Sequence, residues 1–263
     1  MITYPNCKIN LGLHIVGKRP DGYHNLETIF LPVVESLTGG MAFRDELEIV
    51  ETDCPTYVQQ DGIALDNAPE DNLCMKAYRL LRSEFDMPEV AIRLNKGIPF
   101  GAGLGGGSSD AACTLKMLNN MFSLGLSDSE LEQRAARIGA DCAFFIKNTP
   151  AYATGIGDIL EPVDIDLSGY RILVELPENE HVSTREAYSG LNRTLFGHPR
   201  PDLREVVKKP VGSWREHIVN DFEASVFPMH PAIQHLKMEM YRRGALYASM
   251  TGSGSAVFGI FKA

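Results

Sequence analysis

The residues most suggestive of chemistry lie in PFGAGLGGGSSDAA, residues 99–112, where residues 101–109 include five glycines and two serines. Glycine has no Cβ, so the backbone N–H groups of such a segment can crowd around an anion. The apolar spacing that follows predicts a helix, and a helix N-terminus carries about half a positive charge. The segment therefore predicts a phosphate-binding loop. Its expected residues are Pro99, Phe100, Gly101, Ala102, Gly103, Leu104, Gly105, Gly106, Gly107, Ser108 and Ser109.

The polar residues that close the loop have separate expected roles. Ser108 or Ser109 is expected to cap the following helix. Their hydroxyls can also donate to phosphate or ligate a phosphate-bound magnesium ion. Asp110 falls in the predicted first turn, where it suits the helix dipole but repels a bare phosphate. A phosphate neutralised by magnesium fits that position better.

Other readings of the glycine loop are weaker. Residues 101–106 match GxGxxG, but a dinucleotide-binding turn needs an acid at the end of the next strand, and Asp128 and Glu130 begin a predicted helix instead. The sequence contains no GKS or GKT and no HRD or DFG, which argues against a Walker A loop and a protein kinase. A flexible linker is disfavoured because an amphipathic helix follows at once.

The first long strand is expected to carry polar side chains to the same region. Residues 7–16 alternate apolar and polar positions, which predicts a half-buried strand. Lys8 and Asn10 share its polar face and are expected to point into a cleft. A turn at residues 17–22 contains Gly, Pro and Asp and leads into another strand-like run, so a hairpin is predicted.

The remaining pattern is of mixed strands and helices. Further strands are predicted at 46–50, 90–94, 170–176, 246–250 and 255–261. Helices are predicted at 71–85, behind the loop, from the capping box Ser127-x-x-Glu130 to Gly139, and around 231–243. Asp141 is expected just ahead of an apolar strand, CAFFI. The pattern changes near residue 150, which predicts two domains, 1–155 and 156–263.

Composition excludes several classes of function. The chain has 263 residues and a net charge of −9, which argues against sequence-independent binding of nucleic acid. No run approaches the roughly 18 apolar residues that span a membrane, and the N-terminus does not resemble a signal peptide, so a cytoplasmic protein is expected. Five cysteines without a CxxC pair argue against a disulfide framework and a zinc site.

Several of these motifs resemble those of a known protein family. PFGAGLGGGSSDAA resembles the second motif of the GHMP kinases, whose ATP phosphates lie in such a loop. Residues 8–30, 139–145 and 250–261 resemble other signatures of that family in the same order, with Ala143 where proline is usual. The resemblance implies an α+β, two-lobed GHMP kinase fold. Its N-terminal lobe is like domain 2 of ribosomal protein S5, and its C-terminal lobe is ferredoxin-like.

The resemblance also implies a reaction. ATP is the expected phosphoryl donor, with Mg²⁺, and the substrate is a small molecule carrying a cytidine diphosphate group. The expected acceptor is the 2-hydroxyl of 4-diphosphocytidyl-2-C-methyl-D-erythritol, in non-mevalonate isoprenoid synthesis. Asp141 would take up or orient the hydroxyl proton, and Lys8 would polarise the oxygen. An ordinary Lys8–Asp141 ion pair is the plainer alternative. Lys96 is an expected ATP contact, or else a solvated lysine.

The same resemblance assigns the substrate side. Tyr23 and His24 would hold the cytosine with Tyr188 as a second aromatic wall, and stacking contributes about 1–3 kcal/mol per base. Asn10, Thr184 and Lys18 are further expected substrate contacts, and residues 251–255 an element that supports the site. Two alternatives stay open: another GHMP-type small-alcohol kinase, and a non-catalytic nucleotide-binding protein on the same fold.

Overall fold

The computed structural model describes residues 1–34, 43–63, 69–191, 196 and 199–263. These residues form two compact units, each of mixed helices and strands, so the α+β prediction is confirmed. The units are Met1–Cys7, Phe43–Phe100 and Gly105–Thr149, and Lys8–Ala42, Gly101–Leu104 and Pro150–Ala263. The glycine-rich loop contributes residues to both units. A domain boundary at residue 155 stays a prediction.

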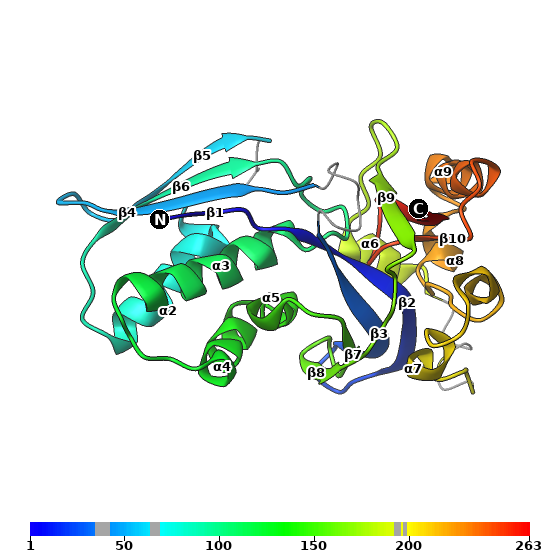
Figure 1. Cartoon of the computed structure of the whole chain (residues 1–263), viewed down its shortest axis with the longest axis horizontal. Helices are drawn as coiled ribbons and strands as arrows, with labels where there is room; N and C mark the ends of the chain where they lie inside the picture. The colour runs from blue at the N-terminus through cyan, green and yellow to red at the C-terminus, as the bar shows by residue number, and fades with distance from the viewer. Residues whose placement is uncertain (35–42, 64–68, 192–195, 197–198) are drawn as a thin grey trace. The chain divides into compact units, whose positions relative to one another are not determined.

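The first unit packs helices on one mixed sheet (Figure 1). Its strand order is β1-β4-β6-β5, with β4 antiparallel and β5 parallel to β6. The strands are β1 (Ile2–Thr3), β4 (Glu46–Glu51), β5 (Tyr57–Gly62) and β6 (Val90–Lys96). The helices are η1 (Pro69–Asp71), α2 (Leu73–Glu84), α3 (Gly106–Met121), α4 (Asp128–Ile138), η2 (Ala140–Cys142) and α5 (Phe144–Lys147). α2 and α3 lie side by side beneath the sheet.

The local sequence explains where several of these helices begin and end. Asn72 accepts a hydrogen bond from the N–H of Cys74 and begins α2. Ser127 and Glu130 form both halves of the predicted capping box, which starts α4 by satisfying otherwise unpaired N–H groups. Gly139 ends that helix, as predicted.

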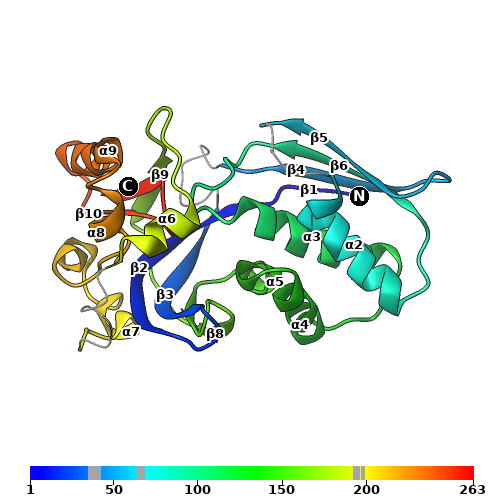
Figure 2. The same cartoon turned by 180° about the vertical axis from the view of Figure 1, so that it is seen from behind.

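The second unit contains two sheets and several helices (Figure 2). The strand orders are β2-β3-β7-β8 and β10-β11-β9. The strands are β2 (Cys7–Lys18), β3 (His24–Val33), β7 (Ala151–Thr154), β8 (Ile159–Pro162), β9 (Tyr170–Glu175), β10 (Tyr247–Met250) and β11 (Val257–Lys262). The helices are α6 (Thr184–Ser189), α7 (Leu203–Val206), η4 (Val211–Glu216), α8 (Glu223–Val226) and α9 (Pro231–Arg242). The predicted hairpin is confirmed as β2 and β3.

The expectation that β2 is half-buried is wrong. Both of its faces are buried from Cys7 to Ile15, and Lys8 and Asn10 are 3% and 1% exposed. The apolar face joins the core, while hydrogen-bonded neighbours cover Lys8 and Asn10 on the polar face. Burial of polar groups is tolerated when partners replace water, so alternation alone does not predict exposure.

His230 lies at the start of α9 and supports a pH-dependent contribution to stability. Its Nδ1 is 2.6 Å from Glu180 Oε2, and its Nε2 is 3.4 Å from Glu186 Oε1. The hydrogen bond to Glu180 raises the pKa of His230 above its ordinary value. A raised folded-state pKa stabilises the protein fully below the unfolded value, about 6.5, and the gain disappears as pH rises through the folded value.

We therefore expect His230→Gln to lower the melting temperature most at about pH 5.5–6 and progressively less toward pH 9. Thermal denaturation followed by circular dichroism across this range measures the difference from the wild type. His235→Gln, at an exposed position on the same helix, is the matched control. A difference for His230→Gln that does not vary with pH would contradict the expectation.

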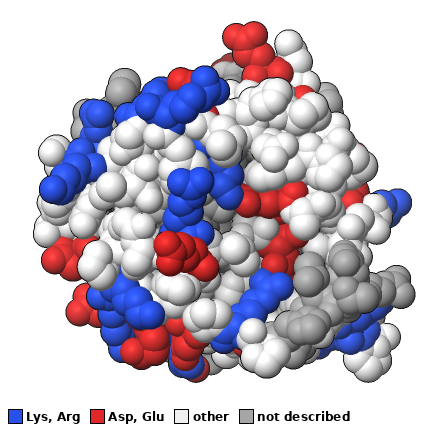
Figure 3. All heavy atoms as spheres, turned by 90° about the vertical axis from the view of Figure 1, so that its right-hand side faces the viewer, with Lys and Arg blue, Asp and Glu red and all other residues white. Residues whose placement is uncertain are grey.

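The surface of one side is mixed in charge. Figure 3 shows Lys and Arg side chains beside Asp and Glu side chains on that face. Within the described residues, no helix is long and apolar enough to cross a membrane.

Candidate active site

The glycine-rich loop turns sharply into α3. Gly101, Gly103 and Gly105 have φ values of 68°, 78° and 72°, in the left-handed region that residues other than glycine rarely adopt. Gly105 is the N-cap of α3, with no side-chain hydrogen bond to the first turn. The prediction that a serine caps this helix is wrong, because the helix begins earlier, at Gly106. An uncapped first turn leaves its N–H groups for an anion.

The serines and Asp110 lie within α3 and differ in burial. Ser108 is half-buried, whereas Ser109 is 1% exposed. Asp110 is beyond the first turn and is 2% exposed, so its predicted place in that turn is wrong. Its carboxylate lies 2.8 Å from Lys96 Nζ.

Lys96 ends β6 and is buried, so the alternative of a solvated lysine is wrong. Its Nζ also contacts the carboxylate of Asp45, just before β4. Asp45 in turn accepts hydrogen bonds from the N–H groups of Gly97 and Ile98 at 2.7 and 2.8 Å. Asp45 gave no signal in the sequence, since it pairs with residues about fifty positions away.

Asp141 lies in a helical turn beside α3. The predicted strand at CAFFI is wrong: η2 contains Asp141, and α5 follows. Burial raises the pKa of the Cys142 thiol to about 12, while the nearby Ser108 hydroxyl lowers it. The turn that contains Asp141 packs against α3, which begins at the glycine-rich loop. The half-buried carboxylate of Asp141 therefore belongs to the same region of the first unit as the uncapped helix end.

In the second unit, Lys8 is the centre of a buried polar network. Its Nζ donates to Asn10 Oδ1 at 2.7 Å and to the carbonyl of Gly103 at 3.1 Å, and lies 5.0 Å from the centre of the Phe30 ring. Asn10 Nδ2 donates to Thr28 Oγ1 at 3.0 Å. These bonds hold the ammonium and amide groups in fixed positions.

The C-terminal glycine motif packs against the loop within the same unit. Thr251 Oγ1 accepts from the N–H of Asn10 at 3.0 Å and donates to Asn10 Oδ1 at 3.2 Å. A Cβ on Gly103 would lie 2.1 Å from the carbonyl oxygen of Thr251. The backbones thus touch directly, which requires glycine. Asn220, which sequence reasoning left unassigned, donates to the carbonyls of Met250 and Gly252 at 2.9 and 2.8 Å.

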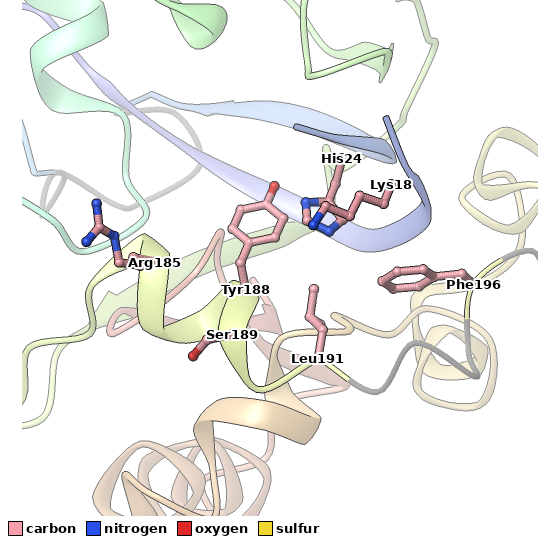
Figure 4. Close-up of a pocket in the computed structure, with 7 residues that line it drawn as sticks. All are labelled: Lys18, His24, Arg185, Tyr188, Ser189, Leu191 and Phe196. Carbon is pink, nitrogen blue, oxygen red and sulfur yellow. The ribbon is translucent and has the colours of Figure 1, made fainter. Parts of the chain in front are cut away.

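A pocket of about 250 Å³ lies beside α6 (Figure 4). It is lined by Lys18, His24, Arg185, Tyr188, Ser189, Leu191 and Phe196. His24 and Tyr188 stack with ring centres 4.8 Å apart and planes at 25°. Phe196 meets His24 edge to face at 5.9 Å. A planar ring and an anionic group suit this combination of aromatic and cationic side chains.

The other predicted substrate residues lie outside that pocket lining. Tyr23 is 62% exposed in the turn before β3 and does not line the pocket. Thr184 Oγ1 is 3.2 Å from Ser253 Oγ of the C-terminal glycine motif. The structure therefore brings His24, Tyr188 and Lys18 together, and Thr184 to the glycine motif.

Family models identify the class of this fold and loop. The model of the GHMP kinase N-terminal domain matches residues 72–149, and that of the C-terminal domain matches residues 203–263. Mevalonate kinase of Methanococcus jannaschii shares the fold, with a TM-score of 0.71 at 14% identity, covering 100% of this chain and 90% of that one. The fold is that of a GHMP kinase.

Proteins with higher sequence identity to this chain indicate which family of GHMP kinases it belongs to. The 4-diphosphocytidyl-2-C-methyl-D-erythritol kinase of Bacteroides thetaiotaomicron is 52% identical over 100% of this chain and 92% of its own. That of Parabacteroides distasonis is 50% identical with the same coverage. A crystal structure of 4-(cytidine 5'-diphospho)-2C-methyl-D-erythritol kinase gives a TM-score of 0.81 at 29% identity, covering 98% of this chain and 89% of that one. The chain therefore belongs to this family of GHMP kinases, which use ATP as phosphoryl donor.

Proposed function

We propose that the protein transfers the γ-phosphoryl group of ATP to the 2-hydroxyl of 4-diphosphocytidyl-2-C-methyl-D-erythritol. The observation that carries the proposal is the uncapped N-terminus of α3, with the Asp141 turn packed against the same helix. It offers an anion site and a carboxylate within one compact unit. The relatives' shared name supplies the substrate.

The loop residues 99–109 would bind the ATP phosphates, and Lys96 would support that loop through its contacts with Asp45 and Asp110. The N–H groups at the start of α3 would donate to phosphate oxygens, and the helix dipole would favour their charge. Phosphoryl transfer requires mainly positioning and stabilisation of charge. Backbone donors in fixed positions meet that need without covalent chemistry.

Asp141 and Lys8 would act on the hydroxyl. Asp141 would orient the hydroxyl and accept its proton, and Lys8 would stabilise the negative charge that develops on the oxygen. The network around Lys8 supports this role, because an ammonium held by Asn10 and Gly103 needs little reorganisation during the reaction.

Magnesium is part of the proposal. No group of three or more His, Cys, Asp or Glu that could hold a metal is found among the described residues. Waters and substrate phosphates commonly supply several of the ligands of Mg²⁺, and the half-buried Ser108 hydroxyl at the start of α3 would be a further donor. The ion would neutralise phosphate charge there.

On the substrate side, His24, Tyr188 and Tyr23 would hold the cytosine, and Asn10, Thr184 and Lys18 the diphosphate or sugar. The pocket beside α6 supports the roles of His24, Tyr188 and Lys18, since these three side chains line it together, and Tyr23 lies outside its lining. A cytoplasmic location belongs to the same proposal, because the reaction consumes ATP.

The direct test is release of ADP by the purified protein with Mg-ATP and each of four alcohols. These are 4-diphosphocytidyl-2-C-methyl-D-erythritol, mevalonate, homoserine and galactose. Turnover of the cytidyl alcohol alone supports the proposal. Preference for another alcohol would overturn the substrate assignment but not the loop, and ATP binding without turnover would favour the non-catalytic alternative.

We expect Tyr188→Leu to raise KM for the cytidyl alcohol about 5- to 100-fold, because base stacking contributes about 1–3 kcal/mol. KM for ATP should stay within about threefold, since loss of a stacking partner affects one substrate. Steady-state kinetics with each substrate varied in turn measures both values. Tyr57→Leu, in β5 of the other unit, is the control. Equal increases in the two KM values would contradict the assignment.

A further inference from the structure

Asp45, Lys96 and Asp110 form a buried ion cluster in the first unit, here called the Lys96 cluster. Their side chains are 0%, 2% and 3% exposed, respectively. Lys96 Nζ contacts Asp45 Oδ2 and lies 2.8 Å from Asp110 Oδ2. To reach a nucleotide the ammonium would have to leave both carboxylates buried without their partner, which is strongly unfavourable.

The Lys96 cluster joins the backbone before the glycine-rich loop to the helix after it. Asp45 Oδ1 accepts from the N–H groups of Gly97 and Ile98, which lead into the loop. Asp110 belongs to α3, which follows the loop. A Cβ on Gly106 would lie 2.8 Å from Ile98 Cγ2 and 3.3 Å from Lys96 Nζ. The first residue of α3 therefore packs directly on the cluster.

The charge of the Lys96 cluster is a poor match to a direct role in attracting ATP. One ammonium faces two carboxylates, and Asp110 Oδ1 is buried with no hydrogen-bond partner among the described residues. Burial raises the pKa of the Asp110 carboxyl above its usual range, with Lys96 opposing that shift. Two acids beneath a phosphate site do not increase its affinity for anions by charge. Their contacts instead hold backbone in place.

We propose that the Lys96 cluster positions the first turn of α3 for the phosphates of ATP, and that Lys96 acts through Asp45 and Asp110 without touching the nucleotide. This rests on the proposed function insofar as ATP is taken to bind at that turn. Lys96 and Asp110 are then positioning residues. The two roles predict different results for removal of the Asp110 side chain: ATP binding should stay unchanged or tighten if only charge matters, and should weaken if position matters.

The test compares Lys96→Met, Asp110→Ala, the double variant and Asp110→Asn. Isothermal titration gives Kd for Mg-ATP, and kinetics gives kcat and both KM values. Lys96→Met and Asp110→Ala should each raise Kd roughly 10-fold or more, because small misplacements of binding groups are costly. The Kd of the double variant should exceed the higher of the two single-variant Kd values by less than about threefold, since the two single substitutions remove the same interaction. Asp110→Asn keeps an oxygen for Lys96 and should restore Kd to within about threefold of the wild type.

Arg134→Met is the matched control, since it removes an ion pair with Glu84 in the same unit. It should leave Kd unchanged, and none of the cluster variants should change KM for the alcohol.

The proposal is overturned if Asp110→Ala leaves Kd unchanged or lowers it, or if the two single effects multiply. Lower melting temperatures with unchanged Kd would also overturn it. Should Lys96→Met fail to fold, Asp110→Ala and Asp110→Asn decide. A wild type that binds ATP but does not phosphorylate the cytidyl alcohol overturns the proposed function alone, because the Kd comparison still holds.

Discussion

Asp141→Asn is expected to lower kcat about 10²–10⁴-fold, the usual contribution of a positioned acid or base. The amide has nearly the same shape but cannot take up the hydroxyl proton. The turn that carries it is held by the hydrogen bond from the Cys142 N–H to the Gly139 carbonyl, at 3.1 Å. The variant should therefore keep its fold and its affinity for ATP. Single-turnover and steady-state assays of ADP release measure the loss.

Asp128→Asn provides the comparison, because it makes the same chemical change at an exposed position in the first turn of α4. It should retain wild-type activity. A kcat for Asp141→Asn within threefold of the wild type would show that the carboxylate has no part in catalysis. A large increase in Kd for ATP with little change in kcat would mean that Asp141 holds the nucleotide instead.

Gly103→Ala is expected to lower the free energy of unfolding by about 2–5 kcal/mol. Two costs combine: a left-handed backbone at φ 78°, for which strain is about 1–3 kcal/mol, and overpacking of a similar size. The added Cβ would lie 2.1 Å from the carbonyl oxygen of Thr251, which is backbone and cannot rotate away. Urea denaturation followed by circular dichroism measures the change.

The matched control for Gly103→Ala is Gly244→Ala in the same unit. Gly244 has φ 95° and no atom within 4 Å of an added Cβ. Its substitution should cost only the backbone strain, on the order of 1 kcal/mol. Equal losses of stability in the two variants would mean that the close approach of the glycine motif to the loop contributes nothing.

Local patterns in the sequence are sufficient to predict several elements of the fold. The strict alternation of residues 7–16 predicts β2, and Ser127 with Glu130 predicts the start of α4; both are confirmed. The density of glycine predicts a loop of bare backbone ahead of a helix, and in the structure α3 follows that loop directly. These signals work because each depends on neighbours within a few positions.

Predictions from local pattern are wrong where a sequence suits two local structures about equally well. A short apolar run such as CAFFI suits a strand or a helix, and in the structure this run packs beside α3 as a helical turn. Serine is a common N-cap residue, so the sequence favours a serine at the start of α3. In the structure Gly105 is the N-cap instead, because it adopts the left-handed backbone that the loop requires.

The burial of charged side chains, and the groups that they hold in place, depend on contacts made by folding. Lys8, Lys96 and Asp110 are ordinary polar residues by local pattern, yet they are 3%, 4% and 2% exposed. Their partners lie far along the chain, as Gly103 does for Lys8 and Asp45 for Lys96. Burial of a charge depends on partners that replace its water, and those partners are brought near by folding rather than by sequence spacing.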